Sequence, residues 1–340
     1  MTKRFVSLFA GVGGFDLGFE RLGWECIGQV EKDGKCNEVL AKNWPNVPRH
    51  NDVTTAIDWM KDAGLQGSVD VVCGGFPCQD VSVAGKRAGL AGERTGLFWD
   101  ALAFAKAAQA KWIVLENVPG LLSSNQGRDF GVVITALADA GYGHVEWRVL
   151  DSQFFGVPQR RRRVFIVASS EPPRAGEILT EHYSSKWYHS ASRTTKQEAS
   201  DRTRSGPTPY VKVIRSGKRD AEGNLPPEVW AERDVSPTLN AFDNGSESRA
   251  TVIAFSHTQG LDAQPSEVAT PTLRTGGAGM AALTDGVVRR LTPIECERLQ
   301  GFPDRWTDGV SDSSRFKQMG NAVTVPVATY IAHCIEEASC

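Results

Sequence analysis

RFVSLFAGVGGFDLGFE, residues 4–20, joins an apolar run to an amphipathic run through a loop that holds three glycines. The apolar run predicts a strand over Phe5–Phe9, and Phe15–Leu22 is predicted to be helical. Glycines between a strand and a helix allow the backbone to approach a ligand closely. The stretch therefore predicts the first strand and helix of an α/β sheet, with a nucleotide-like ligand at the turn or, as the alternative, only a tight turn.

The same alternation continues through the first half of the chain. The other predicted strands are Glu25–Val30, Val69–Cys73, Trp112–Leu115, His144–Leu150 and Val164–Ala168. A second helix is predicted over the alanine-rich stretch Phe98–Ala110. Strands that alternate with helices indicate βαβ units and a parallel sheet.

The character of the sequence changes between about Pro172 and Gly286, where Ser, Thr, Gly, Asp and Arg dominate. Within it, the stretch Lys186–Arg219 holds nine cations and two anions. This excess suits phosphate binding, although a solvated basic loop would have the same composition. The region predicts a smaller, irregular, partly β domain or an inserted recognition module.

Ordered sequence resumes at Val287. Thr292 before Pro293 and Glu295 predicts the start of a helix, and Gly301 predicts its end. A final helix is predicted over about Val325–Glu337.

Composition limits the classes of protein that remain. The apolar fraction of 41%, the charged fraction of 23% and the net charge of -2 are ordinary for a globular protein. No apolar run approaches the roughly 20 residues of a membrane span, and the N-terminus does not resemble a secretion signal, so an intracellular protein is expected. The seven cysteines form no CxxC pair, which argues against a disulfide framework or a zinc site.

The glycine loop departs from a dinucleotide-binding fingerprint. The pattern G-x-G-x-x-G would need a glycine where Asp16 stands. An acid near a helix N-terminus suits a ligand without phosphates, and S-adenosylmethionine is such a ligand. Glu31, 20 residues after Gly11, could accept both ribose hydroxyls, and Asp52 could bind the adenine amino group.

Three further sites carry reactive or charged groups. GGFPCQ, residues 74–79, follows a strand, and its glycines and proline predict an unusual backbone that presents Cys78, although a lone cysteine is usually buried core. Glu116-Asn117-Val118-Pro119 follows the next strand. Four arginines in the run 160–163 precede another; they could form a solvated turn, or Arg163 could point into a cleft.

These blocks occur in the order that is found in the DNA (cytosine-5-)-methyltransferase family, bacterial and phage type. The chain resembles that family through Phe9-x-Gly11-x-Gly13-Gly14, Pro77-Cys78-Gln79, Glu116-Asn117-Val118, Gln159-x-Arg161-x-Arg163, the stretch from Arg290 to Pro303, and Gly320-Asn321-Ala322-Val323. The resemblance spans nearly the whole chain apart from about 170–285, where the family carries its variable target recognition domain.

The resemblance implies an α/β fold, a Rossmann-like S-adenosylmethionine methyltransferase sheet with helices on both faces, plus a smaller, irregular, partly β target recognition domain. The implied catalytic domain covers 1–170 and is completed by 318–340. The recognition domain would cover 171–287, with a connecting helix and hinge at 288–317.

The implied activity is transfer of a methyl group from S-adenosylmethionine to C5 of a flipped-out cytosine in a specific double-stranded DNA sequence, which leaves S-adenosylhomocysteine. Cys78 would form a covalent bond to C6, Glu116 would hydrogen-bond or protonate N3, and Arg163 would hold O2. Arg161 and Asn117 belong to the same catalytic blocks.

Cofactor and DNA contacts are also implied by matching positions. The cofactor residues would be Phe9, Ala10, Gly11, Val12, Gly13, Gly14, Glu31, Asp52, Val53, Gly75, Pro77, Leu97, Asn321 and Val323. The DNA contacts would be Gln79, with Ser82, Lys86, Arg87 and Arg94 in a segment that resembles the family's catalytic loop, and Thr272, Leu273 and Arg274 in the recognition domain. The chain departs from the family at Lys32, where many members carry an aromatic residue that forms one wall of the adenine pocket.

The implied partner is double-stranded DNA, with no membrane and no metal, in the bacterial cytoplasm or nucleoid. A monomer is expected, and a cognate restriction endonuclease could belong to the same system. Three rival functions are weaker. A tRNA cytosine methyltransferase would lack the long insertion, and a nicotinamide-dependent oxidoreductase would not explain Pro77-Cys78-Gln79. A non-catalytic DNA-binding relative would not keep every catalytic position.

Overall fold

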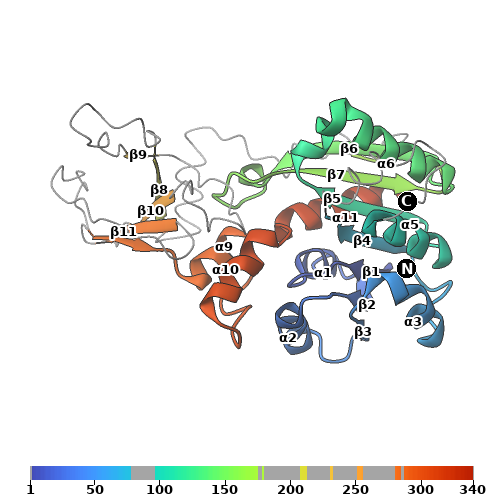
Figure 1. Cartoon of the computed structure of the whole chain (residues 1–340), viewed down its shortest axis with the longest axis horizontal. Helices are drawn as coiled ribbons and strands as arrows, with labels where there is room; N and C mark the ends of the chain where they lie inside the picture. The colour runs from blue at the N-terminus through green and yellow to red at the C-terminus, as the bar shows by residue number, and fades with distance from the viewer. Residues whose placement is uncertain are drawn as a thin grey trace.

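The main body of the molecule is built on one seven-stranded sheet (Figure 1). The computed structural model describes residues 2–77, 96–174, 178–179, 207–212, 230–232, 251–255, 280–284 and 287–339, with the backbone alone between 207 and 290. The strands of the main sheet are β1 (Arg4–Leu8), β2 (Glu25–Val30), β3 (Arg49–His50), β4 (Val71–Gly75), β5 (Trp112–Asn117), β6 (His144–Asp151) and β7 (Arg162–Ser169). Their order is β3-β2-β1-β4-β5-β7-β6.

Helices connect and cover these strands. The α-helices are α1 (Gly14–Glu20), α2 (Gly34–Asn43), α3 (Ala56–Asp62), α5 (Leu97–Ala107), α6 (Arg128–Asp139), α9 (Pro293–Leu299), α10 (Asp312–Asn321) and α11 (Val325–Ser339). Short 3-10 turns are η1 (Val53–Thr55), η2 (Pro119–Leu122), η3 (Ser124–Gly127) and η4 (Ser152–Phe154). The six strands predicted from sequence are all present, and their ends lie within two residues of the predicted ends.

The prediction of an all-parallel sheet is wrong at one strand. The pairs β1–β2, β2–β3, β1–β4 and β4–β5 are parallel, but β7 runs antiparallel to both β5 and β6. The connection between β6 and β7 holds only the short turn η4 and no α-helix. A connection of that length forms a hairpin, because a parallel pair needs a longer crossover.

Alternate side chains of the main sheet pack into two separate hydrophobic cores, one on each face. In β5, Ile113 and Leu115 join the cluster that includes side chains of α3, α5 and α6. Trp112 and Val114 join the opposite cluster, which includes side chains of α1 and α11. Both faces of the sheet are therefore covered, which explains why β5 is apolar on both of its faces from Trp112 to Leu115.

A second sheet is formed by residues of the later region. Its strands are β8 (Pro207–Lys212), β9 (Trp230–Glu232), β10 (Thr251–Phe255), β11 (Met280–Thr284) and β12 (Val287–Arg290), in the order β12-β11-β10-β8-β9. Figure 1 shows it at the far end of the molecule from the main sheet. All five strands fall in the stretch whose composition predicted an irregular, partly β structure, or at its C-terminal margin.

The helix that follows β12 begins as the sequence predicted. Thr292 Oγ1 accepts from Glu295 N at 3.3 Å, and Glu295 Oε2 accepts from Thr292 N at 2.8 Å, so both halves of a capping box are present. Gly301, with φ 79°, ends α9 in the left-handed region.

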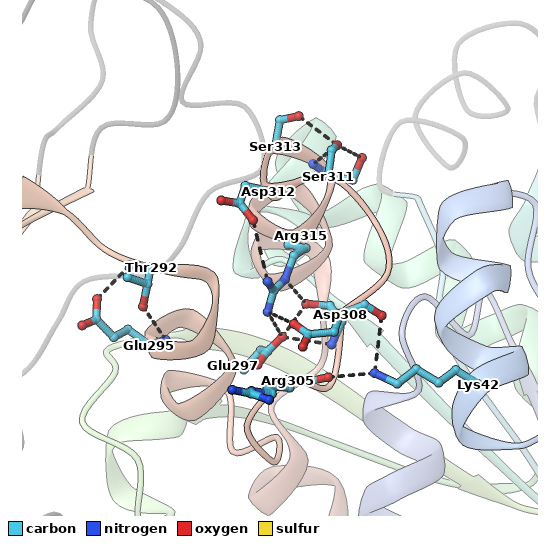
Figure 2. Close-up of polar contacts among 12 residues, drawn as sticks. Lys42, Thr292, Glu295, Glu297, Arg305, Asp308, Ser311, Asp312, Ser313 and Arg315 are labelled. Atoms are coloured by element: carbon cyan, nitrogen blue, oxygen red, sulfur yellow. Dashed lines mark hydrogen bonds and ion pairs between the residues drawn. The ribbon is translucent and has the colours of Figure 1, made fainter.

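A buried ion cluster ties α9 to α10 (Figure 2). Glu297 of α9 is fully buried, and its Oε1 accepts from Thr307 N at 2.9 Å and from the Thr307 hydroxyl. Arg315 of α10 lies 2.9 Å from the same oxygen and 2.8 Å from Asp308 Oδ1. Lys42 of α2 donates to the backbone oxygen of Arg305 at 2.9 Å, which joins the cluster to the main body. The segment between α9 and α10 is therefore held by charge as well as by packing.

Replacing Arg315 by Met should destabilise the protein by about 3 kcal/mol or more, because the Glu297 carboxylate would stay buried without its cation. The double variant Arg315→Met/Glu297→Gln should regain most of that loss. Free energies of unfolding from urea titrations would measure both. The exposed pair Arg298–Asp304 gives the control, since Arg298→Met should cost at most about 1 kcal/mol. An equal cost for Arg315→Met and Arg298→Met would contradict the assignment.

Candidate active site

Several of the predicted site residues that the structure describes lie at one edge of the main sheet, where the parallel strands β1, β2, β4 and β5 have their carboxyl ends. The loop 9–14 follows β1, Glu31 follows β2, and Gly75 ends β4. Glu116 and Asn117 are the last two residues of β5. Ligands of open α/β sheets bind at such edges, so the topology collects these groups into one candidate site.

The loop after β1 requires its glycines. Gly11 and Gly13 have φ of 58° and 86°, and Phe9 adopts φ 52°, which is strained for a residue with a side chain. A Cβ on Gly13 would lie 2.3 Å from the ring of Trp44. Gly13 N donates to Ala10 O at 2.9 Å and closes the turn. The loop therefore has one tightly determined backbone conformation.

Glu31 is anchored by backbone amides on both of its oxygens. Oε2 accepts from Gly11 N at 2.7 Å, and Oε1 accepts from Asp33 N at 2.7 Å. Asn37 Nδ2 donates to the Glu31 carbonyl oxygen at 2.6 Å. Burial raises the pKa of the Glu31 carboxyl, and these backbone bonds oppose the rise. Each carboxylate oxygen keeps a lone pair for a hydroxyl donor, as ribose recognition requires.

Asp52 lies at the start of η1, after β3. Its Oδ1 accepts from Thr54 N at 3.0 Å and from the Thr54 hydroxyl at 2.8 Å, and these bonds hold the pKa of Asp52 below its usual value. Lys32, the position of the departure from the family, lies 3.8 Å from Asp52 Oδ2. The neighbouring Val53 is buried. The carboxylate of Asp52 is thus oriented but still accessible.

Asp16 lies in the first turn of α1, and its side chain is turned into the core. Asp16 is fully buried, and its carboxylate accepts from Ser7 Oγ at 3.0 Å, Gln29 Nε2 at 2.8 Å and Cys26 Sγ at 3.4 Å. It therefore lies between α1 and the strands β1 and β2. The acid that breaks the dinucleotide fingerprint is therefore part of the protein core, since no part of its side chain reaches solvent.

A carboxylate and a guanidinium form the charged centre of the site. Glu116 Oε1 lies 2.9 Å from Arg163 Nε, and both side chains are largely buried. Burial raises the pKa of the Glu116 carboxyl, whereas the charges of Arg163 and Arg161 oppose that rise. A Cβ on Gly75 would lie 3.0 Å from Glu116 Oε2, so the glycine keeps β4 close to the acid. The side chain of Arg163 therefore lies against Glu116 and is not part of a solvated turn.

Asn117 holds the backbone that leads to Cys78. Its Nδ2 donates to Phe76 O at 2.9 Å, and its Oδ1 accepts from Val118 N at 2.8 Å. The amide therefore braces the end of β4 against the end of β5.

Arg161 is almost completely buried, unlike its neighbours Arg160 and Arg162 in the arginine run. Its Nη1 donates to Gly320 O at 2.9 Å, and its backbone N donates to Asp151 Oδ1 at 3.0 Å. Burial, with the nearby charge of Arg163, lowers the pKa of Arg161 to about 9.

The C-terminal part of the chain closes the site beside the glycine loop. Asn321 is exposed and Val323 is partly buried. A Cβ on Gly14 would lie 2.4 Å from Val323 O, so these backbones are nearly in contact. Residues about 310 positions apart in the sequence thus form adjacent walls.

Several predicted residues lie outside the described residues. These are Cys78, Gln79, Ser82, Lys86, Arg87, Arg94, Thr272, Leu273 and Arg274. Pro77, exposed at the end of one described stretch, and Leu97, half-buried at the start of the next, lie on either side of the first gap. Where the structure describes the chain, it shows no converging group of three metal-ligating side chains and no helix able to cross a membrane.

Sequence reasoning missed the supports of the site. Asp33, which caps α2 and donates its own N–H to Glu31, could have been found as an acid before Gly34 at a helix start. Ser152, Gln300 and Thr324 form a buried hydrogen-bond chain with no local signal, because they come from three distant segments.

Comparisons with known proteins find relatives over nearly the whole chain. Residues 3–337 match the model of the family described as C-5 cytosine-specific DNA methylase. The type II methyltransferase M.Sau3AI of Staphylococcus aureus is 30% identical over 98% of this chain and 95% of its own. M.Bsp6I of Bacillus sp. is 29% identical over 98% of each chain.

Solved structures show the same fold at lower identity. A putative DNA modification methyltransferase encoded within an E. coli prophage superposes with a TM-score of 0.62 at 18% identity, covering 99% of both chains. The Dnmt2 methyltransferase of S. pombe gives a TM-score of 0.61 at 17% identity and 98% coverage of both.

Asp16 makes stability depend on pH in a way that Asp16→Asn should remove. Burial raises its folded-state pKa above 3.8, so its favourable contribution is complete below that pH and is lost as pH rises through the raised value. Thermal melting should therefore show the Asn variant gaining on the parent between pH 4.5 and pH 7.5. An Asn amide could also donate to Gln29 Oε1, which has no partner among the described residues. Asp16→Ala, which removes the acceptor, should be less stable at every pH, and a pH-independent difference for Asp16→Asn would contradict the assignment.

Proposed function

The chain belongs to the C-5 cytosine-specific DNA methylase family, and on that basis we propose that it methylates C5 of a flipped-out cytosine in a specific double-stranded DNA sequence. The reaction would use S-adenosylmethionine and a covalent bond between Cys78 and C6. The observation that carries the proposal is the buried pair Glu116–Arg163, which lies at the sheet edge where β4 leads to Pro77 and Cys78.

The cofactor would lie across the ends of β1 and β2. Glu31, already oriented by Gly11 and Asp33, would accept the ribose hydroxyls. Asp52 and Val53 would meet the adenine edge, and Phe9 would stack on the ring. The strained conformation of Phe9 supports a binding role, because such strain persists where surrounding contacts determine it.

Other walls of the pocket would come from distant segments. Gly75, Pro77 and Leu97 would face the methionine part from one side. Asn321 and Val323 would face it from the other, next to Gly14. S-adenosylmethionine supplies an electrophilic methyl group on a sulfonium, and this pocket carries carboxylates and backbone groups that suit a cationic ligand without phosphates.

The chain's own groups would activate the cytosine. The Cys78 thiolate would add to C6 and form a C–S bond, which makes C5 nucleophilic. Glu116, whose carboxyl burial favours the protonated form, would share its proton with N3 as negative charge develops there. Arg163 would hold O2.

Release follows the transfer of the methyl group to C5. A base, for which water is the proposed group, would remove the proton at C5. The electron pair would then re-form the C5–C6 double bond and expel the Cys78 thiolate. The base must leave the helix stack to reach these groups, since C6 is inaccessible to a side chain inside a duplex.

DNA contacts are proposed for residues outside the described part of the chain. Gln79, Ser82, Lys86, Arg87 and Arg94 would meet phosphates near the flipped base. In the recognition region, Thr272, Leu273 and Arg274 would face the bases, since arginine commonly reads guanine in the major groove. With DNA as substrate, the enzyme would act as a monomer in the bacterial cytoplasm or nucleoid, with no metal, and a cognate restriction endonuclease could accompany it.

Cys78→Ala should abolish covalent trapping on DNA that contains 5-fluorocytosine, because the C5 fluorine blocks the final elimination only after the C–S bond has formed. The parent, incubated with S-adenosylmethionine and a random-sequence fluorinated duplex, should give a slow-migrating protein–DNA band on a denaturing gel. Cys334→Ala, which alters a buried cysteine of α11 remote from the site, should trap like the parent. A parent that traps only on fluorinated RNA, or on nothing, would overturn the proposed function.

Glu31→Gln should weaken S-adenosylmethionine binding by roughly 10-fold or more, since it removes a charged acceptor and points an amide N–H at one of two backbone donors. Isothermal titration calorimetry without DNA would measure the affinity. Glu38→Gln, on the exposed face of α2, is the matched control and should bind as the parent does. Unchanged affinity in Glu31→Gln would remove Glu31 from the pocket.

A further inference from the structure

Arg161 is a buried cation, two residues before Arg163 in the chain, that lies between two parts of the site. On one side its charge acts on Glu116 and Arg163, the pair that would handle the cytosine. On the other side its Nη1 donates to Gly320 O at 2.9 Å. Burying a guanidinium costs several kcal/mol unless specific partners offset that cost. An apolar residue would fill this space more cheaply if packing alone were required.

Gly320 begins the segment that, in the proposed function, would face the cofactor. The segment 320–323 continues from it to Val323, whose carbonyl oxygen lies against Gly14 of the glycine loop. A shift of the Gly320 carbonyl would therefore move the backbone that closes the cofactor pocket.

A second hydrogen-bond chain joins the same two regions. Ser152 N donates to Arg161 O at 3.0 Å, and Ser152 Oγ donates to Thr324 Oγ1 at 2.8 Å. Thr324 Oγ1 in turn donates to Gln300 Oε1 at 2.7 Å, and Gln300 Nε2 donates to Met319 O at 2.7 Å. Both the backbone and the guanidinium of Arg161 are thus connected to the segment 319–324, by routes that are buried throughout.

We propose that Arg161 is a positioning residue that fixes the cofactor wall, the segment 320–323, relative to the Glu116–Arg163 pair. Cofactor binding and activation of the cytosine are then coupled through Arg161. This inference rests on the proposed function, and it gives Arg161 no contact with the reacting atoms. The wall accepts a hydrogen bond from the Arg161 guanidinium, and Glu116 lies within the field of its charge, so loss of the guanidinium should disturb both together.

Arg161→Met tests the coupling in the full-length enzyme. Affinity for S-adenosylmethionine without DNA should fall by roughly 5-fold or more, and the single-turnover methylation rate at saturating cofactor should fall by a similar factor. DNA affinity in a filter-binding assay should stay as in the parent. Arg161→Lys keeps the positive charge but loses the planar guanidinium. It should retain part of both the cofactor affinity and the single-turnover rate that Arg161→Met loses.

Matched variants separate positioning from simple stability. Thr324→Val breaks the second chain and should lower the same two quantities by smaller factors. Thr329→Val removes another buried hydroxyl of the C-terminal helix, one that bonds to Gly18 O and Val325 O outside this chain. It should lower the melting temperature and leave both quantities unchanged. Arg162→Ala, an exposed neighbour, should leave cofactor affinity unchanged.

The outcomes distinguish the two levels of inference. A parent that binds no S-adenosylmethionine would overturn the proposed function, and this inference with it. If the parent binds and methylates but Arg161→Met changes neither quantity or only one of them, the coupling alone is overturned. If Arg161→Met does not fold, the same result in Arg161→Lys would overturn it. Equal effects from Thr329→Val and Thr324→Val would also overturn it.

Discussion

The site depends first on the close approach of two backbones at the edge of the main sheet. A Cβ on Gly14 would lie only 2.4 Å from Val323 O. The two backbones can approach this closely only because Gly14 has no side chain. The contact brings the loop after β1 against the turn before α11, so segments from both ends of the chain lie together beside the candidate site. Gly18 extends the same constraint along α1, since its Cβ would lie 2.5 Å from the Ala328 methyl group.

Around that contact the protein buries charge, and each buried charge has partners. Glu116 faces Arg163, Arg161 reaches a carbonyl across the site, and Asp16 collects three donors beneath the loop. Desolvation raises the pKa of Asp16 and of Glu116 and lowers that of Arg161, and each shift favours the neutral form of the group. In Glu116 this serves the proposed proton-sharing with N3, because a protonated acid is needed there. In Asp16 the same physics only costs stability, since no ligand reaches it.

Much of this organisation could be predicted from local sequence. The glycine loop, Glu31 and the segment Glu116-Asn117 were placed at strand ends because apolar runs mark strands and chain order fixes which end follows. The capping box at Thr292 could also be predicted, because a cap is made by residues three positions apart in the sequence. The direction of β7 was not predicted, although the absence of a helical stretch between the sixth and seventh strands indicates a hairpin. Nor was the burial of Asp16, because a helix N-terminus can turn its first acid toward a ligand or toward the core.

By itself, the sequence determined six strands of the main sheet, four helices, their order and the chemical groups that follow those strands, because these follow from periodicity and from residue type. It also determined family membership, since the motifs recur in a fixed order along the chain. Only the tertiary structure decided that Arg161 and Arg163 of the run 160–163 turn inward, and that Arg161 donates to Gly320 O. A run of identical residues has no internal signal for orientation. Their places are set by β7 running antiparallel beside β5 and by a C-terminal segment that returns to the first loop, and both are long-range facts of packing.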